Sequence, residues 1–168
     1  MAEHIQEERL VAWEMMLRTV NGLVRTFDQE LQKGEDLPLT WYDVLIQLYE
    51  APQEQLRMQA LADLVILSRS GLTRLLDRIE KEGLVRREPS REDRRGYYAI
   101  LTDKGRKVVT RARQLHHKGI AEHFGNYLNQ NDLLAVRRAL GKIQQANPNL
   151  LVKATKDRLE LDGGLASV

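Results

Sequence analysis

The sequence contains no cysteine. This absence excludes disulfide bonds, thiolate metal sites and cysteine-based redox sensing within the chain. No apolar run approaches the roughly 18 to 20 residues that a membrane span requires, and the N-terminal stretch MAEHIQEERL is charged. We therefore expect a soluble, cytoplasmic protein that does not enter a membrane.

A strong net charge is also lacking, because 26 basic residues are offset by 24 acidic ones, which leaves a formal charge of +2. The chain is not a uniformly basic binder, so any surface for nucleic acid must be local. From Arg69 to Arg95 there are nine basic and six acidic residues, a local excess of three. The length of 168 residues fits one domain, or a small module with additional dimerising helices.

Motifs of catalysis are missing as well. We find no phosphate-binding glycine loop, no nucleophile elbow and no cluster of metal ligands. His116, His117 and His123 share one predicted helix, but no thiolate and no histidine pair at i, i+4 spacing accompany them, so we interpret them as surface histidines. We therefore expect no enzymatic activity, no cofactor and no metal.

The middle of the chain has the pattern of two short helices followed by a β-hairpin. Residues 56–65 predict the first helix, and a second helix is expected after the stretch ILSRS and ends at Gly83. The apolar positions of the second helix are Leu72, Leu75, Leu76 and Ile79. Residues 84–89 and 97–101 predict two strands joined by the polar stretch SREDRRG. This order is typical of a winged helix-turn-helix, whose second helix enters the major groove of DNA while the hairpin tip reaches the adjacent minor groove.

The second short helix carries the first set of expected DNA contacts. Its apolar face turns inward, and its N-terminus offers free N–H groups and the positive end of the helix dipole to phosphate. The expected contacts are Ser68, Arg69, Ser70, Thr73, Arg74 and Arg78. Exposed arginines are more often solvated surface charge, so this prediction depends on the hairpin beside them. Asp77 and Glu80 are expected to pair with Arg74 or Arg78 on the helix surface.

The hairpin tip carries the second set of expected contacts, which are Arg91, Asp93, Arg94 and Arg95. The strands on either side would hold these arginines on a rigid hairpin, and guanidinium groups suit the enhanced negative potential of a narrow minor groove. We expect Asp93 to orient Arg95, because an unpaired carboxylate at a DNA surface would only repel phosphate.

These residues resemble a known family. DRRGYYAILT, residues 93–102, fits the Asp-x-Arg-x5-Leu-Thr wing signature of the MarR family of transcriptional regulators, and residues 61–88 are similar to the helix-turn-helix of that family. The resemblance extends over residues 10–143. It implies a homodimer that binds a pseudo-palindromic operator in double-stranded DNA. It also implies repression of nearby genes until a small ligand, often a phenolic or other lipophilic acid, loosens the complex.

The expected fold is mainly α-helical with a small β-hairpin. A winged helix-turn-helix over residues 37–105 is flanked by dimerisation helices at 1–36 and 106–150, and the role of the tail 151–168 is not assigned. Thr40, with Asp43 three positions later, is the expected N-cap of the helix after Pro38, and Thr102 with Asp103 begins the helix after the wing.

The flanking helices have apolar faces that the central module cannot fully cover. Apolar residues recur at steps of three and four from Leu10 to Leu31 and again from Leu133 to Ile143. We expect these faces to form a homodimer, with intramolecular packing as the alternative. A symmetric dimer then requires half-sites about 10 base pairs apart.

A ligand pocket is a further expectation. Four large side chains could line a cleft between the first two helices and the DNA-binding lobe, where they would suit an apolar effector. They are Trp13, Met16, Trp41 and Tyr42. The alternative is that these side chains belong to the core. The alternative to DNA binding is a winged-helix module that docks a protein. Acidic residues in place of the exposed basic ones would favour that module, and this sequence has basic residues there.

Overall fold

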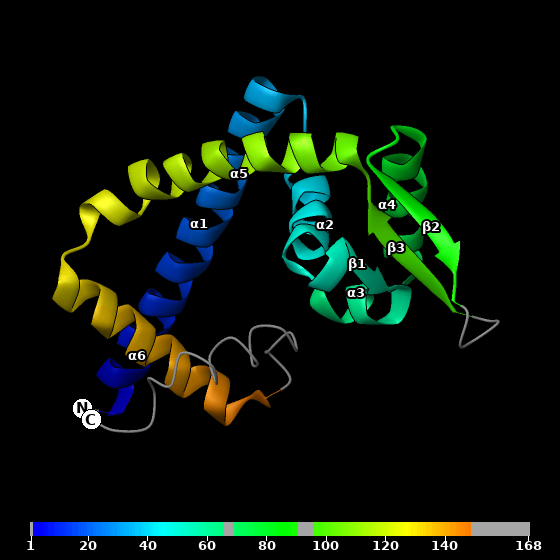
Figure 1. The fold of residues 1–168 in the computed structure, drawn as a ribbon. Coiled ribbons are helices and arrows are strands. Elements are labelled where there is room, and N and C mark those ends of the chain that lie inside the picture. The colour runs from blue at the N-terminus through cyan, green and yellow to red at the C-terminus, as the bar shows by residue number, and fades with distance from the viewer. Residues whose placement is uncertain (1, 66–68, 91–95, 149–168) are drawn as a thin grey trace.

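The computed structural model describes residues 2–65, 69–90 and 96–148. In chain order the elements are α1 (Ala2–Glu35), α2 (Leu39–Glu50), β1 (Gln55–Arg57), α3 (Met58–Leu64), α4 (Arg69–Lys81), β2 (Val85–Pro89), β3 (Tyr97–Leu101), α5 (Asp103–His123) and α6 (Gln130–Ala146). Figure 1 shows α2, α3, α4 and the strands gathered at one end, with α5 running from that end across to α1. The expected mainly helical fold with a small sheet is confirmed. None of the described helices is long and apolar enough to cross a membrane.

The sheet has three described strands where a two-stranded hairpin was expected. β3 lies in the centre, with β1 and β2 antiparallel on either side. The predicted helix over residues 56–65 is therefore wrong at its start, because residues 55–57 form β1 and α3 begins at Met58. Three residues are too few to show strand periodicity, and β1 depends on the pairing of Leu56 with Ala99 far along the chain.

The start of α2 also differs from the prediction. Thr40 is not the N-cap, since α2 begins at Leu39 with Pro38 in the capping position and no side-chain cap. The N–H of Leu39 instead donates a hydrogen bond to Oδ1 of Asp28 in α1, at 2.8 Å. A contact between two helices thus satisfies one of the free N–H groups that a local cap would satisfy.

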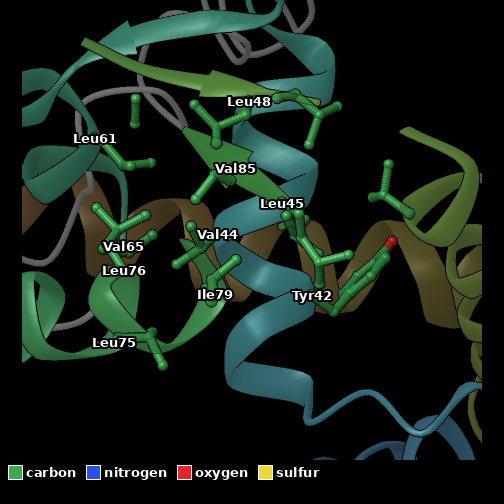
Figure 2. Packing of buried hydrophobic residues seen from close by; sticks show 14 of the residues in the cluster. Tyr42, Val44, Leu45, Leu48, Leu61, Val65, Leu75, Leu76, Ile79 and Val85 are labelled. Carbon is green, nitrogen blue, oxygen red and sulfur yellow. The ribbon is translucent and has the colours of Figure 1, made fainter. Parts of the chain in front are cut away.

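One apolar core joins the helices to the sheet. Figure 2 shows side chains of α2 meeting those of α3, α4 and β2, and its fully buried members include Val44, Leu45, Leu48, Leu61, Leu76 and Ile79. The predicted inward face of α4 is confirmed, because its four apolar residues are at most 4% exposed. Burial of each such side chain contributes roughly 1.5–3 kcal/mol. This packing fixes which face of α4 remains exposed.

Two helical faces stay outside this core. On α1, Trp13, Val20 and Val24 are 57%, 51% and 47% exposed, although Leu31 near the end of the same helix is fully buried. Ile143 of α6 is 45% exposed, and the other exposed large apolar side chains of this helix are Leu134, Val136 and Leu140. Figure 1 shows the N-terminal half of α1 and the whole of α6 away from the sheet. A single chain therefore leaves much of both apolar stripes in contact with solvent.

Candidate nucleic-acid interface

The exposed face of α4 carries a hydroxyl and two basic side chains. Thr73, Arg74 and Arg78 are all exposed, on the side of the helix away from the core. Within the described residues, Arg74 and Arg78 form no ion pair. Their positive charge is therefore available to an anionic partner such as a phosphate.

Arg87 of β2 binds both acidic residues of α4. Its Nε and Nη2 donate to Oε2 of Glu80 at 2.8 and 2.5 Å, and its Nη2 lies 2.8 Å from Oδ1 of Asp77. The hydrogen bond to Glu80 is the main cause that raises the pKa of Arg87 above its ordinary value. The predicted pairing of these acids with Arg74 or Arg78 is wrong, because β2 brings a third guanidinium to the same two carboxylates.

The alternation of side chains along β2 is a sequence signal for this contact. Strand side chains alternate between two sides, and along β2 Val85 is buried while Arg86 is exposed and Arg87 is half-buried. Arg87 thus shares a side with Val85, toward α4. Arg86 instead pairs with Glu88, and both side chains are more than half exposed. The two adjacent arginines have different roles, because Arg87 ties the sheet to α4 and Arg86 lies at the surface.

Thr102 joins the end of α4, the wing and the start of α5. Gly83 ends α4 with a φ of 70°, a left-handed conformation that favours glycine. Oγ1 of Thr102 donates to the carbonyl oxygen of Gly83 at 2.7 Å and accepts from the N–H of Gly105 at 3.0 Å, which confirms Thr102 as the cap of α5. A Cβ at Gly105 would lie 2.0 Å from the carbonyl oxygen of Leu84. The close approach of α5 to the base of the wing therefore requires glycine.

The wing has a regular base. β2 and β3 pair from Val85 with Leu101 to Pro89 with Tyr97. The expected contacts outside the described residues are Ser68, Arg91, Asp93, Arg94 and Arg95, and the side chain of Arg69 is not described either. Ser70 is exposed at the start of α4. The described part of the site is thus α4 and the two strands beside it, and the tip contacts stay predictions.

The four residues of the predicted ligand pocket lie in two environments. Trp13 and Met16 of α1 are 57% and 36% exposed, whereas Tyr42 is 4% exposed in the core and Trp41 packs partly buried against it. Burial raises the pKa of Tyr42 to about 12. Tyr42 therefore belongs to the core, which was the alternative to a pocket. A ligand pocket lined by all four residues stays a prediction.

The interpretation of three surface histidines is wrong for His116, whereas His123 is 35% exposed. His117 is exposed, but His116 packs edge-on against Phe27 with ring centroids 5.0 Å apart, and burial is the main cause that lowers its pKa. Nε2 of His123 lies 2.6 Å from Oε1 of Glu30 in α1. The packing of α1 against α5 decides both contacts, and periodicity within α5 alone contains no signal for them.

Comparison with known proteins gives this arrangement a family. The sequence pattern of the MarR family matches residues 35–96. AbsC, a MarR family transcriptional regulator from Streptomyces coelicolor, has 30% sequence identity and a TM-score of 0.78, and the match covers 83% of this chain and 94% of AbsC. This chain belongs to the MarR family.

Two further relatives agree with this assignment. Sco3205, another MarR family regulator from Streptomyces coelicolor, whose structure is a complex with DNA, is 31% identical with a TM-score of 0.75 over 83% of this chain and 85% of Sco3205. The HTH-type regulator YkoM of Bacillus subtilis is 33% identical over 86 residues, which span 51% of this chain and 54% of YkoM. This MarR-family protein is a transcriptional regulator rather than an enzyme.

Proposed function

We propose that this MarR-family regulator binds a pseudo-palindromic operator as a homodimer, with α4 of each subunit in the major groove and each wing at the adjacent minor groove. The observation that carries the proposal is the exposed face of α4. Four buried apolar side chains and the contacts of Arg87 hold this helix against the sheet, while Arg74 and Arg78 face solvent. A fixed helix with basic side chains on its free face is suited to a DNA groove.

The residues have distinct expected roles. Thr73 and Arg74 lie in the first half of α4 and are expected at base edges together with Ser68, Arg69 and Ser70, because recognition helices present their early turns to the bases. Arg78 lies one turn further and is expected at phosphate. In the wing, the minor-groove contacts are Arg91, Arg94 and Arg95, with Asp93 orienting Arg95.

The exposed apolar faces support the homodimer. Large side chains of α1 and α6 that are 37–59% exposed would be covered by the same faces of a second copy, as in a two-fold symmetric interface. Such an interface would place two copies of α4 at half-sites about 10 base pairs apart. Light scattering would then report twice the mass of 19.4 kDa.

Repression and its release by a small apolar or phenolic ligand complete the proposal. Trp13 and Met16 on the exposed part of α1, together with Trp41 and Tyr42 of α2, are the side chains expected to meet the ligand. A ligand that binds one arrangement of the dimer better than another shifts the population between them. Action on an operator implies a cytoplasmic location.

Selection from random duplex DNA at roughly physiological 0.15 M salt tests the proposal. We expect an inverted repeat with half-sites about one helical turn apart. Arg74→Ala should weaken binding and relax the preference at one position of each half-site. Arg18→Ala is the control, because Arg18 is an exposed arginine on α1 paired with Glu14. Binding that is blind to sequence, or an equal effect of both variants, would contradict the assignment of α4 as the recognition helix.

A further inference from the structure

A mixed cluster of ionisable side chains lies between α1 and α5. Glu30 comes from α1, and Glu122 and His123 come from the last turn of α5, the end of that helix that is remote from the sheet (Figure 1). One oxygen of each carboxylate and one ring nitrogen of the histidine all lie within 4.8 Å of one another. We refer to these three residues as the Glu–Glu–His cluster. The proposed DNA contacts do not use it.

Glu30 is held in place on the surface of α5. Its Oε1 lies 2.6 Å from Nε2 of His123, and the two side chains are 30% and 35% exposed. A Cβ at residue 119 would lie 2.5 Å from Oε2 of Glu30, so the carboxylate rests where Gly119 has no side chain. The ring of Phe27 lies 6.3 Å from that of His123, centroid to centroid. The packing of the two helices therefore positions the carboxylate and the imidazole together before any ligand arrives.

The cluster is also accessible. Glu30, Gly119 and Glu122 line a surface hollow of about 300 Å³ between the two helices, which Lys33 and Lys118 also line, and His123, 35% exposed, lies next to Glu122 outside that lining. Glu122 is 49% exposed and lies 3.6 Å from the ammonium group of Lys118, which is 68% exposed. An exposed ion pair of this kind contributes only about 0–1 kcal/mol. A cation that enters the hollow can therefore displace Lys118 from Glu122 with little loss.

One imidazole nitrogen and two carboxylate oxygens form a donor set that suits zinc. Zn²⁺ is bound by histidine and carboxylates at about 2.0–2.2 Å, often by three protein ligands with water in the fourth position, whereas Mg²⁺ prefers octahedral sites made of oxygen. Two ligands of a tetrahedral zinc ion lie about 3.4 Å apart by this geometry. The Glu30–His123 pair, at 2.6 Å, would open by less than about 1 Å to admit the ion. We propose that the Glu–Glu–His cluster binds one Zn²⁺ ion per chain and so links α1 to α5.

Two carboxylates would also balance the charge of the ion. With a neutral imidazole the cluster carries a formal charge of −2, equal and opposite to Zn²⁺, and the tautomer with its proton on Nδ1 leaves Nε2, the atom that contacts Glu30, able to bind the ion. The bound ion would stabilise the folded chain, because it binds the assembled pair of helices and not two separated segments. This proposal does not depend on DNA binding, so its failure leaves the proposed function untouched.

Zinc titration of the full-length, tag-free protein against a competing fluorescent chelator tests the site. We expect one Zn²⁺ per chain and an affinity at least tenfold weaker in His123→Gln, whose amide can still donate to Glu30 but offers no imidazole. Glu122→Gln should weaken binding in the same direction. His117→Gln is the matched control, because His117 lies exposed on the same helix and outside the cluster. Mg²⁺ in excess should not compete.

Thermal unfolding gives a second measurement that separates loss of the ligand from loss of the fold. Zinc should raise the unfolding midpoint of the wild type and of His117→Gln but not that of His123→Gln, whose midpoint without zinc shows whether it folds. If His123→Gln does not fold, Gly119→Ala, which pushes on the Glu30 carboxylate, should weaken zinc binding instead. The proposal is wrong if the wild type binds zinc with a dissociation constant above about 10 μM, which is far weaker than a structural zinc site. It is equally wrong if the cluster variants bind zinc as tightly as His117→Gln.

Discussion

Replacing Arg87 by methionine would remove its side-chain contacts with α4, while keeping a long apolar stem and the hydrogen bond from the backbone N–H of residue 87 to Glu80. In the wild type, the guanidinium of Arg87 contacts the carboxylates of Asp77 and Glu80 at 2.5–2.8 Å. After the change, the two carboxylates would remain close together on α4 without this counter-charge. We therefore expect lower stability and weaker operator binding, because α4 would be held less firmly and the potential beside its basic face would be more negative.

The expected loss of stability in Arg87→Met follows from the exposure of the three side chains. A hydrogen bond to a charged group contributes about 1.5–3 kcal/mol when it is well shielded. Here Arg87, Glu80 and Asp77 are 28%, 31% and 47% exposed, so solvent screens the pair and we expect a loss of about 1–2 kcal/mol for the whole set. Arg86→Met is the matched control. Its pair with Glu88 is 53% and 54% exposed, so its loss should stay below about 0.5 kcal/mol.

Urea unfolding followed by far-UV circular dichroism would measure both variants. The protein concentration must be equal in all samples, because the stability of a dimer depends on it. Operator affinity at matched salt is the second measurement. If Arg87→Met and Arg86→Met were equally stable and bound DNA equally, the contacts of Arg87 would not hold α4, and this reasoning would be refuted.

Three further predictions concern the junction and the core. Gly105→Ala should destabilise the fold by at least about 2 kcal/mol, because the new Cβ would meet the Leu84 carbonyl oxygen. Gly22→Ala is the control and should be neutral or stabilising, because a Cβ there meets nothing within 4 Å. Equal unfolding midpoints of the two variants would contradict the prediction. Thr102→Val should cost about 1 kcal/mol through loss of the cap, measured by the same unfolding assay, and no loss would show that the cap contributes nothing. Burial raises the pKa of Tyr42 from 10.0 to about 12, so the folded state keeps a proton that the unfolded state releases. Stability is then intact below pH 10 and falls by roughly 1.4 kcal/mol per pH unit between pH 10 and 12. Tyr42→Phe should lack this part of the fall in stability at alkaline pH. An identical fall in the wild type and in Tyr42→Phe would contradict the prediction.

Local patterns were sufficient for the elements that carry the proposed DNA contacts. The inward face of α4 follows from apolar residues at helical spacing, and the structure buries all four of them. The strands of the wing and the cap at Thr102 are also local features, since alternation and the residues of a turn or cap lie within a few positions of one another. The predicted order of helices and hairpin is therefore the order observed.

Contacts between distant segments were not predictable in this way. β1 exists through its pairing with β3, α2 begins where Asp28 of α1 meets the N–H of Leu39, and the acids of α4 are bound by Arg87 of a strand. The cluster of Glu30 with His123 joins residues that are 93 positions apart. Spacing along α5 alone contains no sign of Glu30, so this cluster was not predictable from local patterns.

The sequence by itself determined which faces of the helices are apolar, where the chain turns and which basic residues remain outside. These properties depend on side-chain chemistry at short spacing, so they are present before the chain folds. Only the tertiary structure decided the partners of the charged groups, the third strand and the burial of His116 and Tyr42. A long-range contact depends on how two elements pack, and many sequences with the same local pattern could pack differently.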